Sequence, residues 1–119
     1  DKVTKTTKGV KYRVHADGVW KDKNVTAWHG RNMTIEMECP PGILGSLYVK
    51  FNDWNKKGRQ GLLEFEGRKV KLGNHQGKEG KWIKFHVMRE DSNDGKLILK
   101  TKVTQGGNLM ISQIVLTKE

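Results

Sequence analysis

The chain has 119 residues, of which 34% are hydrophobic, and it contains a single cysteine, Cys39. This length suffices for one domain with its own core, and a lone cysteine excludes a disulfide within the chain. The net charge of +10 fits either a polyanionic partner or ordinary solubility, because the lysines are scattered rather than gathered in one block. No apolar run approaches the roughly 18 residues of a membrane span, so no membrane partner is expected.

The first ten residues are rich in Thr and Lys. We expect a linker end or a loosely held edge strand at 1–10, followed by a β-sandwich domain at 11–119.

Apolar and polar side chains alternate in a series of short runs that begins at Met33, Ile35 and Met37. A period of two is typical of antiparallel sheets with one face in solvent. The apolar phase of the later runs predicts a core made of Leu47, Val49, Phe51, Leu63, Phe65, Ile83, Phe85, Val87, Leu97, Leu99, Ile114 and Leu116.

The last run, 109–116, is apolar in both phases, which predicts a central strand. Between the runs, Glu66-Gly67-Arg68 predicts a tight hairpin and Asp94-Gly95 predicts a turn. Eight or nine short strands without a helix indicate an all-β protein, built as an antiparallel β-sandwich or barrel.

The sequence offers no catalytic arrangement. A hydrolase requires a nucleophile with its base, or paired carboxylates in a cleft. The chain has no Gly-x-Ser-x-Gly segment, its strand acids fall in the solvent phase, and its four histidines are dispersed without zinc-site spacing. We therefore predict no catalytic residue and no enzyme activity in this chain.

Tryptophans and amides gather in the expected loops instead. An indole packs against the apolar face of a sugar ring, while Asn, Asp, Gln, His and Arg bond its hydroxyl edges. The predicted carbohydrate-binding residues are Trp54, Asn52, Asp53, Asn55, Arg59, Trp28, His29, Asn74 and His75.

Each tryptophan also has a structural interpretation. Trp82 begins a strand and is expected to be a core or rim plug, whereas Trp20 and Trp28 fit either role equally. Trp54 is favoured as a ligand contact, because no other apolar residue lies between Asn52 and Gly61.

Two long segments carry a resemblance to a known family. They are GSLYVKFNDWNKKGRQGLLEFEGRKV and EGKWIKFHVMREDSNDGKLILKTKVTQGGNLMISQIVL. Their order and spacing resemble the galactose-binding-domain-like jelly rolls that occur as accessory modules of bacterial glycoside hydrolases. The resemblance covers roughly residues 33 to 117 and implies a jelly-roll β-sandwich.

The resemblance also implies a function. Such modules bind glycans through loops at one end of the sandwich, and many hold a structural calcium, for which Asp17 and Asp22 are the only acids we can name. No other cofactor is expected.

We expect a non-catalytic carbohydrate-binding module for a polysaccharide or oligosaccharide. It would be an accessory domain of a larger secreted enzyme, found outside bacterial cells, on their surface or in the periplasm, with a parent catalytic domain as partner. The positive charge favours an anionic glycan, whose acid groups would pair with Lys56, Lys57 and Arg59.

Two alternatives stay open. One is a bracing domain without a ligand, whose tryptophans are buried against the parent enzyme. The other is a nucleic-acid-binding β domain that uses Tyr48, Lys50, Lys84 and His86 on an outward sheet face, although the chain lacks the glycine-aromatic ribonucleoprotein signature.

Overall fold

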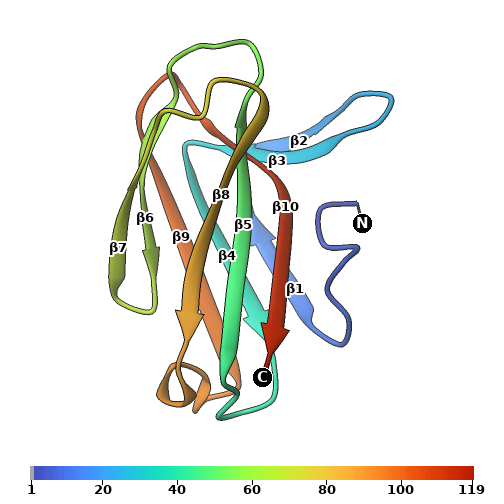
Figure 1. The fold of residues 1–119 in the computed structure, drawn as a ribbon, viewed down its shortest axis with the longest axis vertical. Coiled ribbons are helices and arrows are strands. Elements are labelled where there is room, and N and C mark those ends of the chain that lie inside the picture. The colour runs from blue at the N-terminus through green and yellow to red at the C-terminus, as the bar shows by residue number, and fades with distance from the viewer. Residues whose placement is uncertain (1) are drawn as a thin grey trace.

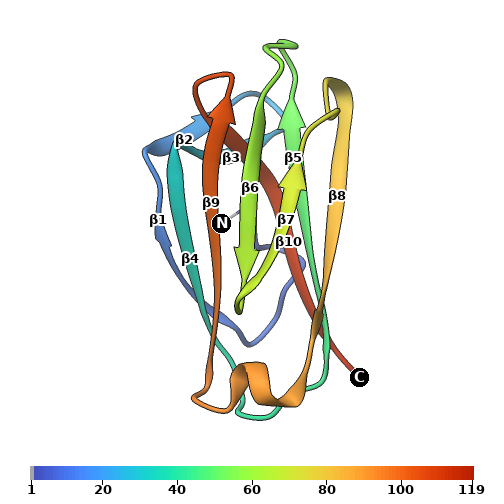
Figure 2. The same cartoon turned by 90° about the vertical axis from the view of Figure 1, so that its left-hand side faces the viewer.

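The computed structural model describes residues 2–119, and in that range it contains ten β-strands and one short 3-10 helix, η1 (Arg89–Ser92). The strands form two five-stranded sheets that lie face to face as two layers (Figures 1 and 2). Every pairing between these strands is antiparallel. The predicted all-β sandwich is confirmed. The strand number exceeds the expected eight or nine because short strands also form between residues 11 and 30, where alternation is weak.

The strand order of each sheet shows how the chain crosses between the layers. The first sheet runs β1 (Lys11–His15), β4 (Asn32–Glu38), β9 (Lys96–Gln105), β6 (Gln60–Phe65) and β7 (Arg68–Leu72). The second sheet runs β2 (Gly18–Lys21), β3 (Thr26–Gly30), β10 (Leu109–Lys118), β5 (Gly45–Asp53) and β8 (Gly77–Val87). The doubly apolar last run is therefore the middle strand of its sheet, as predicted.

The core lies between the layers and follows the predicted alternation. All predicted core residues are buried except Ile83 and Leu116, which are half-buried and pack against the rim of the core. Ile83 is less covered because β8 is an edge strand with a neighbour on one side only. The period of two thus identified the inward face of the strands.

Residues 2–10 form no strand, but they run beside β10. Val3 is 0% exposed and belongs to the core, and its carbonyl accepts a hydrogen bond of 3.0 Å from the Ile114 N–H. The Thr7 hydroxyl donates to the Ile114 carbonyl at 3.1 Å. These contacts hold the segment against the second sheet, while the domain boundary at residue 10 stays a prediction.

Three connections meet at one end of the sandwich, at the top of Figure 1. They are the β5–β6 loop (54–59), the β7–β8 loop (73–76) and the β9–β10 loop (106–108). The β2–β3 hairpin projects from the sandwich near this end (Figure 1). Within the described residues, no helix has the length and apolar character needed to cross a membrane.

Candidate functional site

The β5–β6 loop is organised by one buried carboxylate. Asp53 ends β5 and is 0% exposed. Its oxygens accept hydrogen bonds from the backbone N–H groups of Lys57 at 3.1 Å, Gly58 at 3.0 Å and Arg59 at 3.1 Å. The chain therefore folds back around the carboxylate, and Lys56 takes a left-handed conformation with φ of 53°.

Arg59 completes this arrangement. Its Nη1 lies 2.6 Å from Asp53 Oδ1 and also donates to Asn55 Oδ1, and its Nε donates to Asn108 Oδ1 at 2.8 Å. Burial alone would raise the pKa of the Asp53 carboxyl, but the hydrogen bonds from Arg59, Lys57 and Gly58 lower it below its ordinary value. Asp53 thus balances the charge of Arg59. The hydrogen bond from Arg59 to Asn108 joins the β5–β6 loop to the β9–β10 loop.

A cleft of about 360 Å³ opens beside this ion pair. We call it the tryptophan cleft, and its lining residues are Trp20, His29, Trp54, Asn55, Arg59, Asn108 and Met110. The indoles of Trp20 and Trp54 lie against each other, with ring centroids 5.1 Å apart and planes 31° from parallel. They form one continuous aromatic surface at the rim of the cleft.

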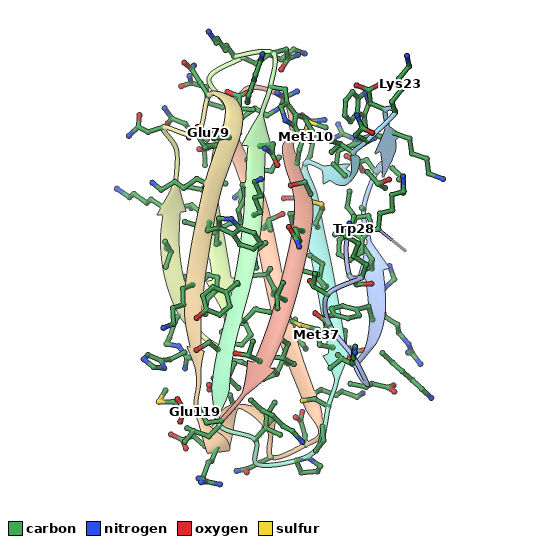
Figure 3. All side chains as sticks on the ribbon, turned by 45° about the vertical axis from the view of Figure 1, so that its right-hand side comes forward. Lys23, Trp28, Met37, Glu79, Met110 and Glu119 are labelled. Atoms are coloured by element: carbon green, nitrogen blue, oxygen red, sulfur yellow. The ribbon has the colours of Figure 1, made fainter. Side chains whose placement is uncertain are left out.

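The β2–β3 hairpin positions the other side of the cleft. Trp20 lies opposite Ala27, and His29 lies opposite Gly18, so these positions share one face of the hairpin. A Cβ atom on Gly18 would come within 2.8 Å of His29 Nε2, so the imidazole occupies space that only glycine leaves free. Met110, which Figure 3 labels near the upper end of β10, pairs with His29 and is buried.

The structure brings together four of the predicted site residues: Trp54, His29, Asn55 and Arg59. Asn52 is near them, but it is 1% exposed and accepts a hydrogen bond from the Ser112 hydroxyl below a neighbouring cleft. The expectation that Asp53 points toward a ligand is wrong, because both of its oxygens are used to shape the loop.

The expectation that Trp28 offers a stacking surface is also wrong. Trp28 is 4% exposed and belongs to the core, where its ring lies 6.5 Å from that of Tyr12. Adjacent residues of a strand point to opposite faces, and Trp28 pairs with Val19 rather than with Trp20. One of the two hairpin indoles is therefore directed inward and the other outward.

Asn74 and His75 lie outside the tryptophan cleft. Asn74 is exposed and lines a separate cleft of about 220 Å³ with Gln60 and Gln76. His75 is 2% exposed. Burial lowers the pKa of His75, and the Asp53 carboxylate opposes that effect only in part. His75 is thus a covered residue rather than a ligand contact.

Three cleft residues were missed from the sequence: Trp20, Asn108 and Met110. Trp20 could have been selected over Trp28 only by knowing the hairpin register, which decides which indole faces outward. Asn108 follows Gly106-Gly107, but its hydrogen bond with Arg59 spans 49 residues of sequence. Nothing in the local pattern indicates that contact.

The two acids considered for calcium do not share a site. Asp17 precedes β2 and accepts a hydrogen bond from the Arg31 N–H at 3.0 Å, whereas Asp22 follows β2 and accepts one from Lys23 N–H at 2.7 Å. Five steps of extended chain separate them by roughly 16 Å. No group of three or more His, Cys, Asp or Glu residues that could hold a metal occurs within residues 2–119. The donor set therefore does not fit a shared calcium site, and calcium bound mainly by backbone carbonyls stays a prediction.

The tryptophan cleft combines an apolar wall with fixed polar groups. The guanidinium of Arg59 and the amides of Asn55 and Asn108 are held by one another, so their directions are set before a ligand arrives. Arg59 Nη2 takes part in none of these bonds and is the donor that Arg59 offers. An apolar surface edged by oriented donors and acceptors is typical of a small-molecule site.

No family model matches the chain, and no curated protein matches it. Among solved structures, it is similar to the carbohydrate-binding module TmCBM61, determined in complex with β-1,4-galactotriose, with a TM-score of 0.57 and 16% identity over 97% of this chain and 92% of that one. A CBM35 module from Paenibacillus barcinonensis has a TM-score of 0.47 and 17% identity over 96% of each chain. The Podospora anserina GH26-CBM35 β-(1,4)-mannanase has a TM-score of 0.45 and 10% identity over 93% of this chain and 25% of that one.

At these identities the likeness concerns the fold. The chain has the jelly-roll β-sandwich fold of carbohydrate-binding modules, and the resemblance stated from the sequence is confirmed at that level.

Proposed function

We propose that the domain is a non-catalytic carbohydrate-binding module and that its sugar binds in the tryptophan cleft. The observation that carries the proposal is that two contacting indoles and the polar groups of Asn55, Arg59 and Asn108 line the same cleft. The ring face of a sugar packs on the indoles, and its hydroxyl groups exchange hydrogen bonds with the amides and the guanidinium.

The preset polar groups favour binding without rearrangement. Asn55 and Asn108 both accept from Arg59 through their side-chain oxygens, so their amide N–H₂ groups are directed elsewhere and can donate to hydroxyl oxygens. Because these side chains are already held, little conformational entropy is lost when a ligand orders them. His29 adds a further polar group to the lining of the cleft.

The finer parts of the proposal concern context and charge. The module would be an accessory domain of a larger polysaccharide-degrading enzyme that acts outside bacterial cells, at their surface or in the periplasm. Its glycan would be acidic, which the net charge of +10 supports. Arg59 does not supply the pairing cation expected from the sequence, because Asp53 neutralises it, whereas Lys56 and Lys57 are exposed beside it.

The main alternative is a bracing domain without a ligand. Its supporting observation is the exposure of Val19 and Trp20, at 54% and 40%, on the projecting β2–β3 hairpin, where a parent domain could cover them. A bracing domain and a binding module make opposite predictions for the isolated domain, because only the module binds sugar by itself.

Truncation of the cleft tryptophans tests the proposed function. Trp54→Ala and Trp20→Ala should each abolish glycan binding, measured first on a glycan array that includes β-1,4-galactotriose and then by titration calorimetry. Each variant should lose only about 0.5–1.5 kcal/mol of folding stability, the contribution of the contact between the two indoles. Truncation of a buried tryptophan costs more, roughly 3–5 kcal/mol of stability.

Trp82→Ala is the matched control. Trp82 is 46% exposed on β8 and does not line the tryptophan cleft, so its truncation should leave binding to a neutral glycan intact. An isolated domain that binds no member of the array, or a Trp82 variant that fails as completely as Trp54→Ala, would contradict the assignment.

A further inference from the structure

A further cleft lies on the outward face of the β2–β3–β10–β5–β8 sheet. We propose that it is a binding site for the carboxylate or sulfate groups of an acidic glycan whose neighbouring sugar ring occupies the tryptophan cleft. This inference rests on the proposed function and adds the place on the fold and the residues that recognise the charge of the glycan. The cleft has a volume of about 190 Å³ and is lined by four lysines, and we call it the lysine cleft.

The four lysines come from three separate parts of the fold. Lys78 stands at the start of β8, Lys50 rises from β5, and Lys2 and Lys5 belong to the segment that runs beside β10. Figure 3 labels Glu79, next to Lys78, at the upper part of β8. Four positive side chains from separate segments therefore line one cleft.

The placement of Lys2 and Lys5 is fixed by their neighbour Val3. Val3 is 0% exposed in the core, and its carbonyl is bonded to the Ile114 N–H. Thr7 adds a second connection, because its hydroxyl donates to the Ile114 carbonyl and accepts from the Leu116 N–H. The two lysines are thus carried on a docked segment and lie at the cleft in the folded domain.

Within residues 2–119, no carboxylate balances the charge of this cluster. None of the described residues that line the cleft is acidic, and none of the four lysines forms an ion pair with a carboxylate of residues 2–119. Elsewhere in that range, Arg31, Arg59, Arg68 and Lys96 each have an acidic partner. Ammonium groups gathered around one concavity repel one another and attract an anion, and the concave shape strengthens that attraction.

The floor of the cleft is polar because of a bulge in β10. The pairing of β10 with β5 shifts register between Ile111 and Gln113, so one extra residue enters the strand. Ile111 and Ile114 are consequently both buried in the core, while Ser112 and Gln113 line the cleft. The bulge directs two neighbouring polar side chains toward the same surface, where they can bond sugar hydroxyls.

Trp54 connects the two clefts, because it lines both of them. A glycan that packs against Trp54 in the tryptophan cleft can therefore extend over Lys50 and Lys78. A nucleic acid offers the same negative charge, but the aromatic surface at this junction is edged by the amides Asn55 and Asn108, which fit sugar hydroxyls. We therefore assign the occupant as an acidic glycan.

The test compares matched ligands and matched variants. The ligands are neutral β-1,4-galactan, polygalacturonate, a sulfated galactan and a single-stranded oligonucleotide, each titrated by calorimetry at low and high salt. The variants are Lys50→Gln/Lys78→Gln in the cleft and Lys69→Gln/Lys71→Gln on β7 of the opposite sheet. Both pairs remove the same charge, so an effect of net charge alone would be equal in the two.

The quantity measured is the ratio of affinities for the acidic and neutral glycans. The unmodified domain should prefer one acidic glycan by roughly tenfold, since two or more exposed ion pairs each contribute a fewfold gain. Lys50→Gln/Lys78→Gln should bring that ratio close to one, and Lys69→Gln/Lys71→Gln should preserve it. The preference should weaken at high salt. Thermal unfolding of each variant verifies that it is folded.

The remaining outcomes overturn the assignment in distinguishable ways. Binding of neutral glycan without an acid preference would overturn the lysine cleft and the acidic glycan, but it would leave sugar binding in the tryptophan cleft standing. An equal loss of preference in both lysine variants would likewise overturn the lysine cleft alone. Binding to no glycan removes the proposed function and this inference together. Tighter binding of the oligonucleotide that depends on Lys50 and Lys78 would identify a nucleic acid as the occupant.

Discussion

Asp53 shows how one side chain determines the shape of the candidate site. Its carboxylate accepts hydrogen bonds from three backbone N–H groups of the following loop and pairs with Arg59, and both side chains are buried. A buried charge that loses its partner carries a large desolvation cost. Asp53 therefore contributes to stability and to the placement of Arg59 and Asn55, although it does not line the tryptophan cleft.

Replacement of Asp53 by Asn should destabilise the domain by about 3–5 kcal/mol, the usual cost of removing one member of a buried ion pair. Chemical unfolding at pH 7 measures this loss. Asp17→Asn is the control, because the Asp17–Arg31 pair is exposed on both sides, and exposed pairs contribute less than about 1 kcal/mol. Equal losses in the two variants would contradict the role assigned to Asp53.

The folded-state pKa of Asp53 adds a pH signature to this prediction. Since that pKa lies below its unfolded value, the Asp53 contribution is present above the unfolded pKa and is lost as pH falls through the folded pKa. The stability difference between the original domain and Asp53→Asn should therefore shrink in acid.

Among the elements of the fold, the β9–β10 loop supports the tryptophan cleft by packing its backbone closely against the β5–β6 loop. Gly106 has φ of 89°, and a Cβ atom there would lie 2.7 Å from the Cα of Arg59. The loop can therefore approach the β5–β6 loop closely enough for Asn108 to bond Arg59 only when residue 106 has no side chain.

Gly106→Ala should be more destabilising than Gly107→Ala and should also weaken glycan binding. Gly107 has a similar φ of 87°, but a Cβ atom there would meet nothing within 4 Å. Both variants share the backbone strain, so the difference between them isolates the contact with Arg59. Unfolding midpoints measure the effect on stability, and calorimetric affinities measure the effect on glycan binding. Equal losses in Gly106→Ala and Gly107→Ala would show that the close contact between Gly106 and Arg59 is not needed.

For individual strands, the alternation of apolar and polar residues predicted some inward faces and not others. Alternation located the inward faces of β5, β6, β8 and β9 correctly, because a buried face imposes a strict period of two. In β10, continuing that period backward from Ile114 would place Ser112 inward and Ile111 outward, and the bulge reverses both. A bulge depends on the partner strand, so the sequence of one strand does not reveal it.

The candidate site was predictable only in part for a related reason. The wealth of polar residues around Trp54 directed attention to its loop, and Asn55 and Arg59 line the tryptophan cleft, while their role in binding stays a prediction. The choice between Trp20 and Trp28 depended on hairpin register, and the burial of Asp53 depended on hydrogen bonds within a non-repetitive loop. Contacts between distant segments, such as Arg59 with Asn108, have no local signal.

At the scale of the whole molecule, the buried histidine links stability to pH. His75 lies under the loops at the site end, where Asp53 favours its protonated form and Lys81 and Arg59 oppose it. Burial is the largest effect and lowers the pKa of His75 below its ordinary value. The unfolded chain therefore binds a proton more readily than the folded domain does.

Stability should consequently fall as pH drops below about 6.5, the ordinary histidine value, and level off below the folded-state pKa. His75→Leu should remove this slope between pH 7 and the folded pKa, as followed by urea unfolding at several pH values. His86→Gln, at an exposed position, is the control and should keep it. A slope that survives in His75→Leu would assign the effect to another group.

The docking of residues 2–7 along β10 has a practical consequence for attaching the domain to anything else. Lys2 lies at the lysine cleft, whereas β10 carries the chain from the site end toward Lys118, roughly 30 Å away along the strand, and Figure 1 shows the C-terminus at the far end of the sandwich. A surface anchor or reporter joined after residue 119 leaves both clefts facing outward, while one joined before residue 2 stands at their edge. Immobilised through its C-terminal end, the domain should capture long polymer chains more efficiently than when it is immobilised through its N-terminal end.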